Sequence, residues 1–454
     1  MSSFHDEIRA VVSDYVPVDE ETLTQYAVDG LTPSAVVAPD SLESLSGLMR
    51  LASERGLAVV PRGGGTRMNI GLPPERVDLV VSLARLNRMT EHEPADQTAT
   101  AQAGMRMTDL QETLSRAGQY LPLDPAHMDR CTLGGVIASN ASGPLRWTYG
   151  TARDMVIGTK IVQVDGKIVK SGGKVVKNVA GYDLNKMYIG AFGTLGILAE
   201  ITLKLQPLPE TRQAMIGRFP FVSSAMDMAF RVLESNIMPA FLEIANPVPV
   251  GILARKMGGG LGDAGFPLIV GVVGAQETVA WQMAETERLF RQAGALKIIP
   301  LEDERYRVAF DVLREFPSGE VVPHGMSPGI TCRIGVPPEH IGTLYQAMEN
   351  YCQKARIGCG MTGHFGNGTL TFVFYRETSF IETDVDTLSD IVEELQRTAS
   401  GLEGFCVVEH APAFLRKRLA VWGSPRPEWG LMRTLKDRFD PKRLLNPGRF
   451  VGGI

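Results

Sequence analysis

The sequence of 454 residues has no long apolar runs, no cysteine clusters and no strong excess of one charge. No segment approaches the run of about 20 apolar residues that a membrane-spanning helix needs, and the N-terminal residues lack the basic and apolar regions of a signal peptide. We therefore expect a cytoplasmic protein. A net charge of −5, with 44% hydrophobic and 21% charged residues, is typical of a globular protein and indicates no nucleic-acid partner.

Cysteine is scarce and scattered, at Cys131, Cys332, Cys352, Cys359 and Cys406. No C-x-x-C pair or close run is present in the sequence to hold a structural zinc ion or an iron–sulfur cluster, so free thiols are expected. If the chain does redox chemistry, its one-electron carriers must therefore belong to other proteins.

Glycine, in contrast, is concentrated in a few segments. The string PRGGGT at 61–66 lies between two apolar runs expected to be strands, at 57–60 and 78–83, after a helix expected at 42–55. Backbone without side chains can approach a pyrophosphate closely and offer it successive N–H groups. The string matches neither the G-x-G-x-x-G turn of a Rossmann fold nor a P-loop, and a tight loop without a ligand explains it as well.

Further glycine-rich segments strengthen the ligand interpretation. TLGGVIASNASG at 132–143 carries small and polar residues where a packed strand would carry bulky ones. YG at 149–150 and GTLGI at 193–197 are similarly thin. Together these segments predict a long cofactor that lies across the backbone.

The pattern changes after the PLP at 207–209 to strand, helix and strand in repeated order. Sheets covered on one side by helices are the simplest solution for such repeats. We expect a two-part domain at 1–209, a second domain at 210–415, and a C-terminal segment at 416–454 that returns to the first domain and contains a helix ending near Phe439.

The order and spacing of PRGGGT, LGG, YG, KNVAGYDL at 177–184 and GTLGI resemble the FAD-binding half of the vanillyl-alcohol-oxidase superfamily. KNVAGYD and the LNPGRF at 445–450 are most similar to FAD-binding subunits of the glycolate oxidase and D-lactate dehydrogenase family. The resemblance is strong over 36–209 and looser elsewhere. It implies an α+β fold, with a two-part PCMH-type FAD-binding domain and a substrate (cap) domain whose antiparallel sheet is covered by helices.

The resemblance also implies how FAD is bound. The loop from Arg62 to Thr66 would wrap the pyrophosphate. Thr66 stands where some relatives carry a histidine bonded covalently to the flavin, which implies non-covalent FAD. The expected cofactor-binding residues are Arg62, Gly63, Gly64, Gly65, Thr66, Pro125, Gly134, Gly135, Asn140, Gly143, Gly150, Ile201 and Asn446.

Two histidine motifs, GHFGNGTLT around His364 and the VEH that ends at His410, resemble family motifs for a divalent metal and a catalytic base. The resemblance implies His364 and Glu409 as metal ligands and His410 as the base that takes the hydroxyl proton of the substrate. Thr371 replaces the second histidine of the metal site, and a hydroxyl is a poor ligand for a transition metal. The alternative is that both histidines are packed, hydrogen-bonded residues in a subunit that no longer catalyses.

A 2-hydroxy acid needs a cation for its carboxylate, and the forked donors of arginine suit that role. Arg333, on an expected strand, is one candidate, although a surface ion pair explains it as well. Lys177 could lie near the flavin as a further catalytic residue, although a capped turn with a contact between Tyr182 and Asp183 is the alternative there. The position where relatives carry a substrate-binding lysine is Thr331 in this sequence.

The resemblance implies two competing functions. The first is FAD-dependent oxidation of a small 2-hydroxy acid, glycolate or D-lactate, to the 2-keto acid, with electrons passed to an iron–sulfur partner. The second is a non-catalytic electron-relay subunit beside a homologous flavin subunit and an iron–sulfur subunit, which Thr371 favours. Direct use of O2 stays open, and sugar or aldonolactone oxidation is less supported by the C-terminal motif. Any association with the inner membrane would be peripheral and through these partners.

Overall fold

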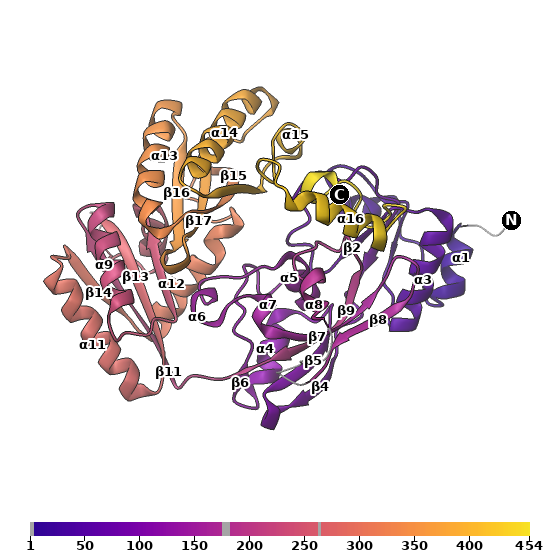
Figure 1. Ribbon diagram of the computed structural model, residues 1–454, viewed down its shortest axis with the longest axis horizontal. Coiled ribbons are helices and arrows are strands. Elements are labelled where there is room, and N and C mark those ends of the chain that lie inside the picture. The colour runs from indigo at the N-terminus through magenta and orange to yellow at the C-terminus, as the bar shows by residue number, and fades with distance from the viewer. Residues whose placement is uncertain (1–3, 175–181, 262–264) are drawn as a thin grey trace. The chain divides into compact units, whose positions relative to one another are not determined.

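The computed structural model describes residues 4–174, 182–261 and 265–454, and the chain divides into two compact units (Figure 1). The first comprises Met1–Ser142, Gly150–Leu208 and Ser424–Ile454, and the second comprises Gly143–Tyr149 and Pro209–Gly423. The segment Gly143–Tyr149, which the sequence places in the first domain, belongs to the second unit, where the Thr148 hydroxyl donates to the carbonyl of Pro239 at 2.7 Å. Within the described ranges, no helix is long and apolar enough to cross a membrane.

The N-terminal part of the first unit is a parallel sheet with the strand order β1-β3-β2. β1 and β2 both run parallel to β3, which lies between them, and the chain crosses from β1 to β2 through α3 (Leu42–Arg55). This helix begins after Ser41, which exchanges hydrogen bonds with Ser44, and ends at Gly56 in the left-handed conformation, so the helix predicted at 42–55 is confirmed. The elements of this part are α1 (Phe4–Val11), α2 (Glu20–Gln25), β1 (Ala35–Val37), α3, β2 (Val59–Arg62) and β3 (Leu79–Ser82).

The second part of this unit is an antiparallel five-stranded sheet. In spatial order its strands are β4 (Met89–Glu93), β5 (Thr98–Gln102), β9 (Ile197–Lys204), β7 (Val156–Val162) and β8 (Ile168–Gly172). Short elements connect them: α4 (Met107–Ser115), β6 (Gln119–Tyr120), α5 (Leu133–Ser139), α7 (Ala152–Met155), α8 (Asn185–Tyr188) and β10 (Gln206–Pro207).

Helix α5 is formed by the small residues at 133–139, a segment in which a packed strand would carry bulky side chains. Thr132 caps it by accepting a hydrogen bond from the backbone N–H of Gly135, at 3.4 Å. The helix packs on β5 and β9 at close range, because a Cβ at Gly134 would lie 2.6 Å from the Cβ of Ala103. The small side chains therefore allow a helix to lie tightly on a sheet.

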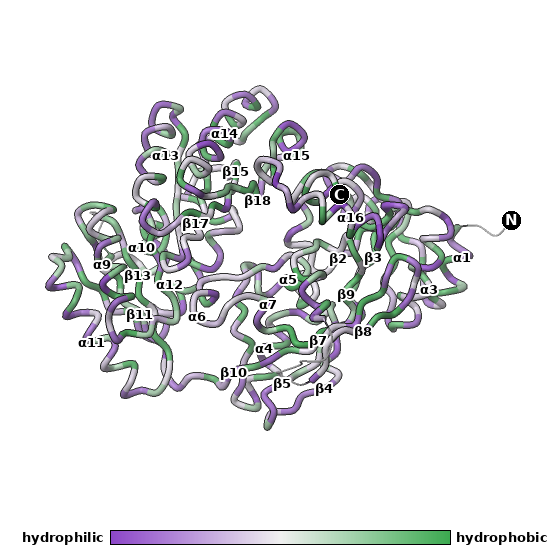
Figure 2. Tube along the Cα trace, viewed as in Figure 1, coloured by the Kyte–Doolittle hydropathy of each residue, from purple (hydrophilic) through white to green (hydrophobic). Residues whose placement is uncertain are grey.

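The second unit is built on one antiparallel eight-stranded sheet. In spatial order its strands are β14 (Lys297–Leu301), β11 (Thr211–Phe219), β13 (Phe266–Gly274), β12 (Phe241–Ala245), β16 (Gly358–His364), β17 (Thr369–Arg376), β15 (Ser327–Gly335) and β18 (Phe405–His410). Figure 2 shows hydrophobic residues concentrated on strands inside each unit and hydrophilic ones along outer helices such as α13.

Four helices form one layer against this sheet, and α9 contacts both α11 and α13 while α13 contacts α14 (Figure 1). Two more, α10 and α12, cover part of the opposite face, where the Phe241 ring contacts those of Tyr306 and Phe310. The prediction of helices on one side is therefore incomplete. The helices are α6 (Arg146–Tyr149), α9 (Val222–Glu234), α10 (Pro247–Lys256), α11 (Gln276–Gln292), α12 (Asp303–Glu315), α13 (Ile341–Ala355), α14 (Val385–Gly401) and α15 (Ala413–Arg416).

The C-terminal helix α16 (Glu428–Phe439), which ends where the sequence predicts, carries a fully buried ion pair. Lys436 Nζ is 2.7 Å from Asp440 Oδ2 and donates to the carbonyls of Thr194 and Leu445, each at 2.9 Å. Burial lowers the pKa of Lys436, and the attraction of Asp440 opposes this shift. The pair ties the C-terminal segment to the turn before β9.

Replacing Lys436 by methionine would leave the Asp440 carboxylate buried without its cation. We expect Lys436→Met to lower the free energy of unfolding by about 3–5 kcal/mol in urea denaturation. The control is Lys442→Met, because Lys442 is exposed and donates only to the Ser53 carbonyl among the described residues. Equal stability of the two variants would show that the buried pair does not hold the segment.

Candidate functional site

The loop after β2 in the first unit is pressed against the residues that lead into α5. A Cβ at Gly63 would lie 2.1 Å from the Thr132 hydroxyl, and one at Gly64 would lie 1.8 Å from the carbonyl oxygen of Arg130. Neither position has room for a side chain. The two glycine-rich segments are therefore brought together in the fold, although Gly63 and Leu133 are 70 residues apart in the chain.

A pocket opens beside this contact. Gly135 is exposed, and a Cβ there would meet only the Thr132 hydroxyl, at an ordinary 3.4 Å. The protein's own packing therefore does not require glycine at 135, whereas a ligand lying against the backbone would. The pocket is lined by Pro61, Arg62, Gly63, Leu83, Gly134, Gly135, Ala138, Tyr188, Phe192, Gly193, Gly196, Ile197 and Leu198.

Arg62 places a positive charge over the loop that follows it. Its guanidinium lies 4.5 Å from the centre of the Tyr26 ring and donates to the carbonyl of Gln25 at 3.4 Å. Gly65 has a φ of 76°, and a Cβ there would lie 2.8 Å from an Arg62 nitrogen. Thr66 follows and is half-buried. A cation and a bare backbone at one loop suit an anionic group such as a pyrophosphate.

Asn140 supplies an unsatisfied polar atom near the end of α5. It caps the helix with a φ of 47°, and its Oδ1 is buried with no hydrogen-bond partner among the described residues. The same is true of the Ser142 hydroxyl. A buried acceptor without a donor is costly, and the N–H groups of a flavin or adenine ring are donors that would satisfy it. The residues present therefore fit FAD.

The other predicted cofactor residues have mixed surroundings. Pro125 is buried, and Ile201 lies fully buried on β9 between β5 and β7. Gly150 has a φ of 81°, and a Cβ there would lie 2.3 Å from Asp154 Oδ2, so its turn alone demands glycine. Gly143 belongs to the second unit. A contact of these four residues with FAD stays a prediction.

Asn446 supports the wall of the pocket. Its Nδ2 donates to the carbonyl of Phe192 at 2.6 Å, and its Oδ1 accepts from Arg449 at 3.2 Å. Leu445, one residue before it, bridges to Val59 of β2. With its amide engaged at both ends, Asn446 positions the turn at Phe192, and its direct contact with FAD stays a prediction.

In the second unit, a row of polar side chains crosses the eight-stranded sheet. Thr362 on β16 pairs with Thr371 on β17, and Thr371 pairs with Arg333 on β15. Residues directly opposite in a ladder share one face of the sheet. Arg333 Nη2 lies 2.6 Å from Glu409 Oε1, and the Glu409 side chain is only 5% exposed. His410, the predicted base, is half-buried and pairs with Thr331.

His364 ends β16 on the same face, two residues after Thr362, and pairs with Glu243 of β12. Its Nδ1 lies 2.5 Å from Glu243 Oε1, and the two side chains are 12% and 2% exposed. Glu243 was not predicted from the sequence. The signal was an acidic residue in the middle of the apolar strand FLEIA, because a charge in a buried strand needs a partner.

These contacts do not fit the divalent metal that the resemblance implies. The Glu409 carboxylate is paired with the Arg333 guanidinium, a positive charge that would repel a metal ion at the same place. Thr371 offers a hydroxyl in place of the missing imidazole. Among the described residues, no group of three or more histidine, cysteine, aspartate or glutamate side chains is placed to hold a metal ion. Lys177, the other predicted catalytic residue, lies outside the described residues.

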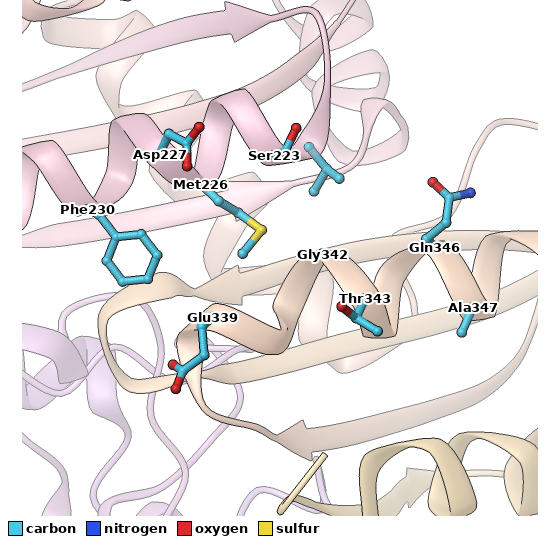
Figure 3. Close-up of a pocket in the computed structure, with 10 residues that line it drawn as sticks. Ser223, Met226, Asp227, Phe230, Glu339, Gly342, Thr343, Gln346 and Ala347 are labelled. Carbon is cyan, nitrogen blue, oxygen red and sulfur yellow. The ribbon is translucent and has the colours of Figure 1, made fainter. Parts of the chain in front are cut away.

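A groove between α9 and α13 lies in the helix layer of the same unit (Figure 3). The ring of Phe230, on the wall of the groove, packs edge to face with the ring of Phe365, with 4.9 Å between the ring centres. Phe365 directly follows His364 in the chain. The groove is lined by Val222, Ser223, Met226, Asp227, Phe230, Glu339, Gly342, Thr343, Gln346 and Ala347.

Comparisons with known proteins show the family of this chain. Residues 33–172 match the model of the FAD binding domain, and residues 208–450 match that of the FAD linked oxidases, C-terminal domain. The chain is 30% identical to "Glycolate oxidase subunit GlcD" of Bacillus subtilis, over 92% of this chain and 88% of that protein. It is 26% identical to a D-2-hydroxyglutarate dehydrogenase of Stutzerimonas stutzeri, over 98% of each chain. It is also 26% identical to the mitochondrial D-lactate dehydrogenase [cytochrome] of Arabidopsis thaliana, over 92% of this chain and 73% of that protein.

Solved structures show the fold. p-Cresol methylhydroxylase matches with a TM-score of 0.77 at 16% identity, over 98% of this chain and 95% of that one. Alkyldihydroxyacetonephosphate synthase matches with a TM-score of 0.74 at 18% identity, over 99% and 86%. The predicted α+β fold, a PCMH-type FAD-binding part with an antiparallel sheet covered by helices, is confirmed.

Proposed function

This chain belongs to the family of FAD-linked oxidases, as an FAD-dependent oxidoreductase of the glycolate oxidase, D-lactate and D-2-hydroxyglutarate dehydrogenase group, and we propose that it oxidises a small 2-hydroxy acid to the 2-keto acid. Glycolate and D-lactate are the substrates we favour, after the names of its relatives. The observation that carries the proposal is the Arg333 guanidinium, half-buried in a row of polar side chains on the sheet.

FAD would be held without a covalent bond, because Thr66 offers no imidazole nitrogen. Arg62 and the glycine loop would lie against the pyrophosphate, and Gly135 and Asn140 would lie along the rest of the cofactor. When bound, FAD supplies the acceptor for the α-hydrogen of the substrate and its electron pair.

Arg333 would bind the substrate carboxylate. Its Nη2 is paired with Glu409, and its side chain is 24% exposed, so other guanidinium N–H groups can meet a carboxylate. Lys177 stays a prediction as a catalytic residue near the flavin. The hydroxyl proton of the substrate would go to a histidine, and His410 is the residue that the resemblance implies.

The electrons would leave to an iron–sulfur partner, because the sequence has no cysteine cluster for one-electron carriers. A homologous flavin subunit is a second proposed partner, and the word "subunit" in the name of the Bacillus subtilis relative supports an assembly. We place this assembly in the cytoplasm, with any contact at the inner membrane peripheral and through the partners.

A second candidate function is a non-catalytic relay, in which the chain binds FAD and passes on electrons from a catalytic homologue. Thr371 favours it, because its hydroxyl stands where the family resemblance implies a histidine ligand of a metal. Both functions require bound FAD, and they differ in whether a 2-hydroxy acid reduces the flavin of this chain.

The test is anaerobic reduction of the purified chain. We expect a flavin spectrum that bleaches with glycolate or D-lactate and is unchanged by L-lactate. Bleaching only after addition of the homologous flavin subunit would support the relay. A chain without bound flavin would contradict both functions.

A further inference from the structure

We propose that the outer face of α16 is the surface on which the iron–sulfur protein docks to take electrons from this chain. This inference rests on the proposed function and adds the place on the first unit where the electrons leave. The outer face is the exposed side of the helix, formed by Gly430, Leu431, Arg433, Thr434, Asp437 and Arg438.

Helix α16 leaves apolar side chains uncovered. A helix on a protein surface is normally held by a stripe of buried apolar residues. All 12 residues of α16 are described, and Lys436 alone among them is buried. The side chains of Trp429, Met432 and Leu435 are half-buried, and Leu431 is 65% exposed. The helix therefore presents apolar surface that a partner can cover.

The inner side of α16 is fixed to the wall of the cofactor pocket. The ring of Phe439 packs edge to face with that of Tyr188, a pocket residue, with 6.2 Å between the ring centres. Lys436 Nζ donates to the carbonyl of Thr194 at 2.9 Å, and Thr194 follows Gly193, which also lines the pocket. A helix with its side chains is about 10 Å across. A carrier on the outer face therefore comes within about one helix diameter of the pocket in which FAD would lie.

The charge around the outer face favours an acidic partner. Outside the buried ion pair of α16, the segment 424–443 carries five basic and two acidic side chains, in a chain whose net charge is −5. Both acidic side chains lie beside arginines of the same segment. Arg433 and Arg438 form no ion pair with a described acidic residue, so both charges are available to an acidic surface. Opposite charges across an interface speed the encounter and orient the partners.

An iron–sulfur protein suits this face better than a second copy of the chain. In a symmetric dimer the same basic face would meet itself, and the like charges would repel. Electron-transfer complexes bury small interfaces, often below about 1,200 Å², a scale that one exposed helix face can supply. The sequence has no cysteine cluster for a carrier of its own, so reduced FAD has to meet the carrier at the surface.

The electron and proton balance closes with this partner. The α-hydrogen of the acid reaches FAD as one proton with two electrons. The iron–sulfur clusters of the partner take the two electrons one at a time, and the proton is released to solvent, which restores oxidised FAD. No atom of α16 reacts, because the helix only positions the carrier.

The first test measures association. The tagged, FAD-loaded chain is isolated at low ionic strength from the cells that make it, with the subunits that stay bound, and iron and acid-labile sulfide are counted per FAD. We expect Leu431→Glu and Arg438→Glu each to lower this ratio by about 10-fold or more, because one puts a charge on the apolar surface and the other reverses a charge. The control is Trp281→Glu on α11, which should keep the wild-type ratio although Trp281 is 50% exposed.

The second test separates docking from flavin chemistry. The iron–sulfur protein released from the wild-type complex at high salt is added back to each variant, and the bleaching of its clusters is followed after anaerobic addition of the acid. Cluster reduction should be slowed by about 10-fold or more in Leu431→Glu and Arg438→Glu. Reduction of their flavin by the acid, and of the small dye dichlorophenolindophenol by the flavin, should match the wild type. Unchanged FAD content and melting temperature establish that each variant is folded.

The outcomes distinguish the docking surface from the proposed function. Wild-type cluster content and cluster reduction in both variants would overturn this inference. Loss of a homologous flavin subunit with the clusters retained, or loss of binding to vesicles of anionic phospholipid with the clusters retained, would overturn it too and reassign the face. A wild type whose flavin no 2-hydroxy acid reduces, even with its bound subunits, would instead refute the proposed function, while the cluster ratios still test the docking surface.

Discussion

Gly64→Ala is expected to weaken FAD binding by up to about 100-fold, because the added methyl group would lie 1.8 Å from the carbonyl oxygen of Arg130. The clash is with backbone, so either the loop or the chain before α5 must move. Overpacking of this kind costs about 1–3 kcal/mol, which corresponds to a loss of up to about 100-fold in affinity if the distortion falls on the cofactor loop. Titration of the apo-protein with FAD, followed by quenching of flavin fluorescence, measures the change.

The control for this variant is Gly430→Ala in α16, where a Cβ would meet no described atom within 4 Å. Alanine in a helix is favourable, so this variant should bind FAD like the wild type. Unchanged FAD affinity in Gly64→Ala would mean that the loop is not the pyrophosphate site. Lost affinity together with a lower melting temperature in the absence of FAD would indicate a general loss of fold instead.

The FAD-binding half could be predicted from the sequence where glycine marks a close contact between two backbone segments. Glycine is required where backbones touch, as at Gly63 and Gly64, and these contacts involve neighbours that the sequence also singles out. The same reasoning cannot separate a glycine needed by a turn from one needed by a ligand. Gly150 illustrates this, because its φ of 81° favours glycine whether or not a ligand is present.

The candidate site on the second unit was less predictable. The motifs located His364, Glu409 and Arg333, but the partners of each depend on strand order, and β12 and β16 are neighbours although more than 100 residues separate Glu243 from His364. Register decides which side chains meet, and a sequence without its sheet does not contain that information. The metal interpretation was weakened by one missing histidine, and the ion pair of Arg333 with Glu409 could be found only in the fold.

Arg333→Met is expected to lower kcat/KM for the 2-hydroxy acid by about 1,000-fold, from loss of the cation that binds the carboxylate. The same change leaves Glu409, 5% exposed, without the guanidinium that neutralises it, and should lower the free energy of unfolding by about 3–5 kcal/mol. Stopped-flow reduction and urea denaturation measure the two effects. Arg376→Met is the control, because that arginine pairs with Asp384 at the end of β17 and should affect kcat/KM little.

The double variant Arg333→Met/Glu409→Gln separates the two roles of the arginine. Removing both charges takes away the buried, uncompensated carboxylate, so most of the lost stability should return. The activity should not return, because the substrate carboxylate still has no cation to bind. Recovery of both would mean that Arg333 serves only to neutralise Glu409 and that the carboxylate is bound elsewhere. Recovery of stability alone would place Arg333 in contact with the substrate.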